Sequence, residues 1–66
     1  MGTAGAADLV RTACRLLLTD SFVVVDAFAI RMDCEREQAR AALKFLTAVG
    51  VAERVSRGTY RLKVAR

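Results

Sequence analysis

The alternation of apolar and polar positions at the start of the chain predicts a helix. Two neighbouring apolar stripes run along the stretch from about Ala4 to Leu18, with spacings of three and four residues. Thr3 is placed to cap this helix, and Asp8 lies near the positive end of its dipole. The polar residues occupy only a narrow face, so this helix is more apolar than one side of a small domain requires.

A change of period marks the next two elements. Residues 21–25 form a run rich in β-branched residues, which disfavours helix and suits a short extended segment. A short third strand near Phe22 to Val24 is therefore one of the alternatives. From Val25 the apolar positions recur at i, i+3, i+4 and i+7, which predicts a second helix over about residues 25–32. Asp33 and Cys34 then interrupt the pattern.

The clearest helical pattern covers residues 35–49. Its apolar stripe is continuous, and Gly50 follows where a left-handed C-cap is expected. Two strand-like runs, residues 51–55 and 59–64, then flank Arg57-Gly58 and predict a terminal hairpin. The 66 residues therefore predict one domain of class α+β, mostly α. The candidate core consists of Leu9, Ala13, Leu16, Phe28, Met32, Leu43, Leu46, Tyr60 and Leu62.

The register of the hairpin follows from its loop. If Arg57-Gly58 forms a two-residue loop, Val55 pairs with Tyr60, and Arg54 stands across from Arg61 on the opposite face. Like charges directly opposed cost some tenths of a kcal/mol, so an anion such as phosphate is expected to compensate them. A three-residue loop would change the parity and with it this register.

The composition predicts that apolar surface remains exposed. Apolar residues make up 55% of the chain, more than a domain of this size can hide. We therefore expect a second copy to cover part of this surface, giving a homodimer. The wide apolar surface of the first helix is the candidate interface, formed by Leu9, Val10, Leu16, Leu17 and Leu18.

The charge is unevenly distributed along the chain. Residues 1–30 carry three acidic and two basic groups, a net charge of −1, whereas residues 31–66 carry four acidic and nine basic groups, a net charge of +5. Such asymmetry indicates a polyanionic partner, either nucleic acid or an anionic membrane surface. A basic surface that only aids solubility is the alternative. Membrane adsorption ranks last because Arg11 and Arg15 are the only basic residues of the first helix.

Several classes of function are not expected from these residues. The chain has no His, no CxxC, no nucleophile motif and no phosphate-cradling glycine loop, so we expect no enzyme, no metal site and no cofactor. Cys14 and Cys34 are expected to be reduced thiols in a cytoplasm. The stretch from Leu16 to Val25 is interrupted by Asp20, so no membrane span is expected. No signal peptide is visible at the N-terminus.

Residues 25–62 resemble winged helix-turn-helix proteins. Residues 28–32 resemble the positioning helix, and residues 35–43 resemble the start of the recognition helix. Residues 45–54 resemble the ending that leads into the wing, and residues 57–62 resemble the return strand of the wing. Bacterial and archaeal repressors of the antibiotic-resistance and arsenic-resistance types share this signature, as do many phage and plasmid regulators.

The resemblance implies three helices with a C-terminal two-stranded wing at about residues 51–64. It also implies a small transcriptional regulator, such as a repressor, that binds specific sequences of double-stranded DNA in a prokaryotic cytoplasm or nucleoid. Asp33 stands where the family usually has Gly or Asn, and Glu35 stands where the helix usually opens with Ser or Thr. Asp33 tolerates a left-handed conformation or could itself cap the helix. A winged helix that binds only protein, as an adaptor or antirepressor, is the alternative.

The resemblance also implies which residues contact DNA. Such domains present the N-terminal half of the third helix to the major groove, opposite the core stripe. The candidates on this helix are Arg36, Glu37, Gln38, Arg40, Ala41 and Lys44. Arg40 suits a guanine edge and Lys44 suits a phosphate. The wing candidates for phosphate are Arg54, Ser56, Arg57, Gly58, Thr59 and Arg61. The alternative for the helix is a solvated face stabilised by its own ion pairs.

Overall fold

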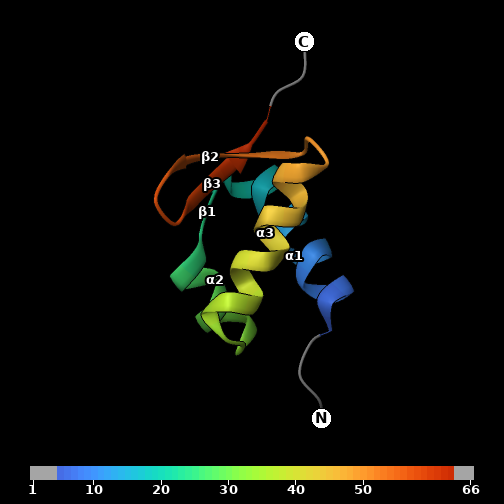
Figure 1. Ribbon diagram of the computed structural model, residues 1–66, viewed down its shortest axis with the longest axis vertical. Coiled ribbons are helices and arrows are strands. Elements are labelled where there is room, and N and C mark those ends of the chain that lie inside the picture. Colours follow the sequence, from blue (N-terminus) through green and yellow to red (C-terminus); the bar gives the residue numbers. More distant parts are fainter. Residues whose placement is uncertain (1–4, 64–66) are drawn as a thin grey trace.

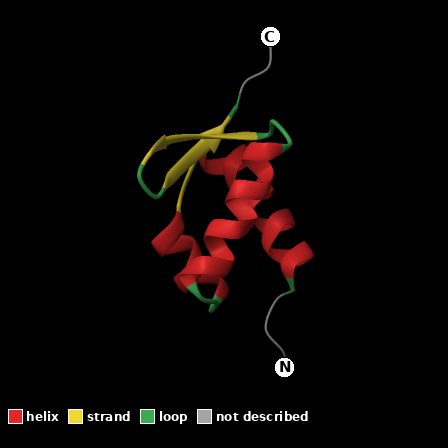
Figure 2. Cartoon of the chain, viewed as in Figure 1, coloured by secondary structure: helices red, strands yellow, loops and turns green. Residues whose placement is uncertain are grey.

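The computed structural model contains three helices and a three-stranded sheet, and it describes residues 5–63 (Figure 1). The elements in chain order are α1 (Ala6–Asp20), β1 (Phe22–Val24), α2 (Val25–Met32), α3 (Arg36–Ala48), β2 (Ala52–Ser56) and β3 (Thr59–Leu62). The sheet lies across one end of the helices, with α3 between α1 and α2 (Figure 2). The expected fold class is confirmed, including the third strand. The predictions for Thr3, Ala4 and Val64 fall outside the described residues.

Helix α1 extends further toward the C-terminus than its apolar pattern predicts. Its N-cap is Gly5, and the helix continues to Asp20, two residues past the predicted end. It stops at Ser21, which has a φ of 76° and whose backbone N–H donates to the carbonyl of Leu17 at 3.0 Å. A left-handed residue ends a helix by turning the chain away from its axis. The polar residue Asp20 therefore sits inside the helix, where an apolar pattern cannot detect it.

The core lies where the three helical stripes meet the inner face of the sheet. The buried apolar residues are Leu9, Ala13, Leu17, Val23, Val25, Phe28, Ala29, Ala39, Ala42, Leu43, Leu46, Ala52 and Tyr60. Three members of the predicted core, Leu16, Met32 and Leu62, are only partly buried at its edge. Leu17 fills the core in place of Leu16, because the α1 stripe that includes Leu9 and Ala13 faces α3 and the sheet.

This packing corrects the predicted dimer interface. Leu9 and Leu17 are 3% and 1% exposed, so a second copy cannot contact them. Their assignment to an interface was wrong because α1 uses this stripe for its own core. Val10 and Leu16 are partly buried against the same core, and Leu18 is 67% exposed.

The turn between α2 and α3 uses Asp33 where a glycine is common. Asp33 has a φ of 54°, and its backbone N–H donates to the carbonyl of Ile30 at 3.2 Å. The backbone N–H of Cys34 donates to the carbonyl of Ala29 at 3.0 Å. The left-handed conformation that the sequence allows for Asp33 is thus present.

Helix α3 is capped by a pair of long side chains. Its N-cap is Glu35, whose backbone N–H donates to Oε1 of Gln38 at 3.0 Å. This is the half of a capping box that satisfies the N-cap donor, and it explains how the helix begins without Ser or Thr. At the other end, Gly50 has a φ of 87° and turns the chain toward β2, as predicted from its position.

The sheet has the order β1-β3-β2, and both pairs are antiparallel. Ser56 pairs with Thr59 around Arg57-Gly58, so the two-residue loop is present. The next pair, however, is Arg54 with Tyr60, and the register shifts between Arg54 and Ser56. The predicted pairing of Val55 with Tyr60 is therefore wrong. Val55 is an extra residue on β2, a β-bulge that changes the parity of the strand.

None of the helices in residues 5–63 is long and apolar enough to cross a membrane. Cys14 and Cys34 are free thiols and partly buried. No group of three or more His, Cys, Asp or Glu within the same residues is placed to hold a metal ion.

Candidate functional site

A groove in which half of the lining residues are basic runs between α3 and the tip of the hairpin. Its lining residues are Val24, Val25, Asp26, Arg36, Arg40, Lys44, Arg54, Arg57, Gly58 and Tyr60. We call this the basic groove. Five of these residues carry a positive charge, and Asp26 carries a negative one. Because the cations come from α3 and from the hairpin, the groove exists only in the folded domain.

Helix α3 supplies three of the cations from successive turns. Arg36, Arg40 and Lys44 are four residues apart, so their side chains lie along one edge of the helix. All three residues are exposed. Leu43 and Leu46, which are 0% and 4% exposed, anchor the adjoining face of the helix in the core. This anchoring fixes the direction in which the basic edge points.

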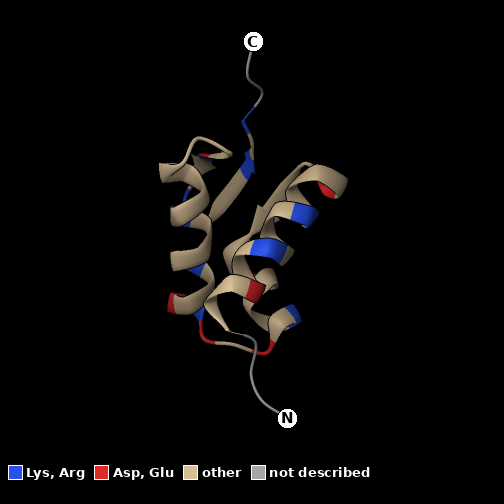
Figure 3. Ribbon diagram, turned by 90° about the vertical axis from the view of Figure 1, so that its right-hand side faces the viewer, with Lys and Arg blue, Asp and Glu red and all other residues tan. Residues whose placement is uncertain are grey.

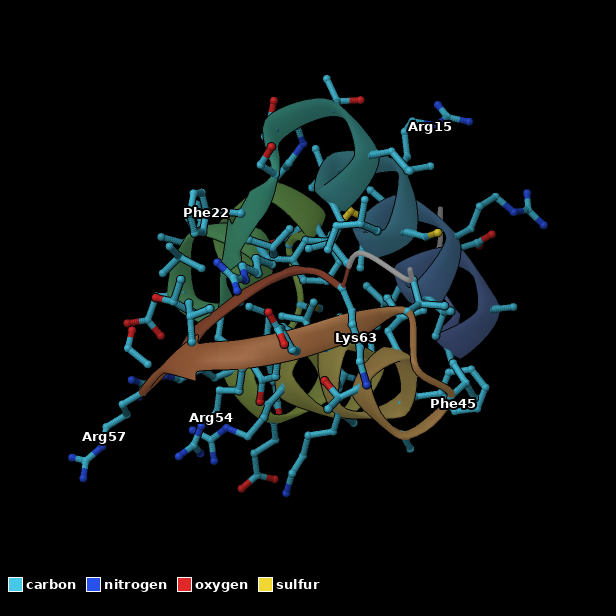
Figure 4. The ribbon with its side chains drawn as sticks, turned by 90° about the horizontal axis from the view of Figure 1, so that it is seen from above. Arg15, Phe22, Phe45, Arg54, Arg57 and Lys63 are labelled. Atoms are coloured by element: carbon cyan, nitrogen blue, oxygen red, sulfur yellow. The ribbon has the colours of Figure 1, made fainter. Side chains whose placement is uncertain are left out.

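The bulge in β2 decides which face of the hairpin carries Arg54. Arg54 pairs with Tyr60, whose side chain is 4% exposed, and cross-strand partners share a face of a sheet. Arg54 is therefore on the face that turns toward α3. Seen from above the sheet, Arg54 and Arg57 extend outward on the same side of the molecule (Figure 4). Arg57 reaches this position from the loop, beside Gly58 with a φ of 76°.

Asp26 forms an ion pair inside the basic groove. Nε of Arg36 lies 2.6 Å from Oδ1 of Asp26, and Nη2 of Arg36 lies 3.5 Å from Oδ2. Both side chains are 62% exposed. Asp26 could not be expected at the site from the sequence, because the pair joins the first turn of α2 to the first turn of α3, ten residues apart. No local pattern signals such a contact.

Arg61 lies outside the basic groove, contrary to its predicted role. It stands opposite Glu53 in the hairpin, and its Nε donates to Oε2 of Glu53 at 2.5 Å. The predicted opposition of Arg54 and Arg61 is wrong because the bulge puts these two residues on different faces. Arg61 instead lines a separate depression with Ser21, Phe22, Glu53, Leu62 and Lys63. Its charge is compensated within the protein, so it does not require a phosphate.

Gln38 and Ala41 lie on the other edge of α3. They line an apolar groove between α3 and the first half of α1, together with Gly5, Ala6, Ala7, Leu9, Val10, Arg11, Ala42 and Phe45. Phe45 is 54% exposed and lies well away from Arg54 and Arg57 (Figure 4). Oε1 of Gln38 is also engaged by the helix cap. Gln38 and Ala41 are thus not brought together with the basic residues.

The remaining predicted residues lie near the basic groove without lining it. Glu37 is exposed at the start of α3, and no ion pair forms on it within residues 5–63. Ser56 is exposed at the end of β2, and Thr59 is partly buried at the start of β3. On the side of the molecule farthest from the loop of the hairpin, basic and acidic positions are both present along α1 (Figure 3). In the basic groove, by contrast, five basic residues stand beside a single acidic one.

Comparisons with known proteins show the fold. No protein-family model and no curated protein sequence matches the chain. The structure is similar to the crystal structure of T. acidophilum IdeR, with a TM-score of 0.69 and 21% sequence identity over 96% of this chain. The chain spans 30% of the length of that protein's chain. The three helices and the three-stranded antiparallel sheet, together with this similarity, show that the domain has the winged-helix fold.

Proposed function

We propose that this domain binds double-stranded DNA and acts as a small transcriptional regulator. The observation that carries the proposal is the basic groove, in which α3 and the hairpin present five cationic side chains to one side of the molecule. A polyanion that follows both elements would neutralise these charges together. Duplex DNA is such a polyanion. When a winged helix binds it, α3 lies in the major groove and the wing lies against the phosphate backbone.

The residues of α3 have separate roles in this proposal. Arg40 is the candidate for base reading, because its guanidinium can donate to O6 and N7 of one guanine. Lys44, one turn further, contacts a phosphate as a point charge. Glu37 has no ion-pair partner among the described residues, so its carboxylate is free to accept a hydrogen bond from a cytosine amino group.

The hairpin contributes affinity rather than sequence preference. Arg54 and Arg57 extend from the wing beside the edge of α3 and contact phosphates. With Arg40 and Lys44 they make four cations without an ion pair in the structure of residues 5–63. The logarithm of the affinity should then fall against the logarithm of the salt concentration with a slope of roughly −3 to −4.

A titration with DNA tests the proposal. The protein is titrated against a labelled pool of random duplexes at low and at moderate salt, and the bound fraction is sequenced. We expect retardation at micromolar protein, a salt slope in the stated range, and enrichment of a short motif. Absence of retardation at ten-micromolar protein and low salt would remove DNA as the partner.

A protein-binding winged helix is the second candidate function. The specific observation in its favour is the apolar groove between α1 and α3, which borders Phe45. Exposed apolar surface of this kind is a feature of protein contacts. An adaptor would leave the DNA pool unbound and would bind its partner independently of Arg40 and Arg57.

A further inference from the structure

The carboxylate of Asp26 occupies the donors of Arg36 that a phosphate would use. It contacts Nε at 2.6 Å and Nη2 at 3.5 Å, along one side of the guanidinium. Carboxylate and phosphate oxygens bind this planar group in the same fork-like manner. One of the five cations of the basic groove is thus already paired when no ligand is present.

The pair can be opened by a competing anion. Both side chains are 62% exposed, and an ion pair that water reaches contributes little to stability. The other cations that line the basic groove attract a polyanion to the place where Arg36 stands. Displacement of the carboxylate is therefore feasible, but it leaves Asp26 close to the phosphates and so reduces the gain from the new contact.

We propose that Asp26 limits the affinity of the basic groove for DNA by competing with phosphate for Arg36. The inference rests on the DNA-binding function proposed above. The free protein presents four unpaired cations to DNA, and the fifth, Arg36, makes a full phosphate contact only when its carboxylate partner is removed. Because every DNA sequence carries phosphates, such competition weakens binding to all sequences alike. Contacts to bases then supply a larger share of the binding free energy.

The variant Asp26→Asn tests the competition. We expect its affinity for the random duplex pool at low salt to rise about threefold to fivefold, the factor that an exposed ion pair represents. The slope of log affinity against log salt should become steeper by about 0.9, because one more phosphate is neutralised. Asp20→Asn is the matched control, since it makes the same charge change at the end of α1, outside the lining of the basic groove. It should leave the slope unchanged.

A purely structural role of the pair predicts the opposite sign. If Asp26 serves only to hold α2 against α3, Asp26→Asn should lower both the thermal midpoint and the DNA affinity. That result would overturn the proposal, and so would an unchanged slope. In an Arg36→Gln background, Asp26→Asn should no longer steepen the slope, because no arginine is released. If the parent protein binds DNA and Asp26→Asn raises neither the affinity nor the salt slope, this inference alone is refuted. If neither protein binds DNA, the proposed function is refuted as well.

Discussion

Glu53 lies directly across the hairpin from Arg61 and accepts a hydrogen bond from its Nε at 2.5 Å. This pair exists because Val55 bulges out of β2 and shifts the register by one residue. The same shift turns Arg54 toward α3. One extra residue in a strand thus divides the basic residues of the hairpin between two faces with different surroundings.

The two faces of the hairpin should differ in their effect on DNA binding. We expect Arg54→Gln to weaken binding to all duplexes and to flatten the salt slope by about 0.9, because a phosphate contact is lost. Arg61→Gln removes the same charge on the Glu53 side and should leave the slope unchanged. Both variants are measured with the random duplex pool over a range of salt concentrations. Equal slope changes would mean that the outer face also contacts the backbone.

Arg40 and Arg57 should affect binding in different ways. Arg40→Ala should cost about 1–3 kcal/mol on the preferred sequence and relax the preference at one base position. Arg57→Ala should weaken binding to all sequences alike and flatten the salt slope by about one. Sequencing of the bound fraction for each variant separates the two effects. An unchanged motif for Arg40→Ala would contradict its role in base reading.

A homodimer remains a prediction for this domain, now with fewer contacts available on α1. Leu18 is exposed, whereas Leu9 and Leu17 are committed to the core. Sedimentation equilibrium at micromolar concentration should show a species of twice the 7.2 kDa mass of the chain. Two copies would present two α3 helices to a two-fold operator. A single 7.2 kDa species would instead favour binding to one half-site.

The packing of α3 can be tested with two neighbouring side chains. Leu43 is fully buried, so Leu43→Ala should lower the free energy of unfolding by about 2–5 kcal/mol, enough to unfold a domain this small. Phe45→Ala removes a larger side chain that is 54% exposed and should cost less than about 1 kcal/mol. Circular dichroism over a range of urea concentrations measures both, and Leu43→Ala should show an early transition or an unfolded spectrum without urea. A larger loss for Phe45→Ala would show that α3 packs in a different orientation.

The end of α1 offers a stabilising substitution. Ser21 holds a φ of 76°, a conformation that costs energy for residues with a Cβ but not for glycine. Ser21→Gly should stabilise the domain by about 0.5 kcal/mol and raise its thermal midpoint by roughly 2–4 °C. Asp20→Gly, one residue earlier at the last helical position, should give no such gain, because a helical φ does not need the freedom of glycine. A fall in the midpoint for Ser21→Gly would contradict the left-handed cap.

Local patterns were sufficient to predict the order of the elements. The spacing of apolar residues marks each helix because one face of it must be buried, and the loop at Arg57-Gly58 follows from the conformational freedom of its glycine. The same spacing places Arg36, Arg40 and Lys44 on one edge of α3, since side chains four residues apart on a helix always share an edge.

Tertiary packing decided the remaining features of the site. Whether Leu16 or Leu17 enters the core depends on the rotation of α1 against α3 and the sheet, and both choices fit the apolar pattern. The bulge at Val55 satisfies the burial of Ala52 and Tyr60 on the inner face, a requirement set by the helices beneath the sheet. The contact between Asp26 and Arg36 arises from the angle between two helices, and no spacing within either helix encodes it.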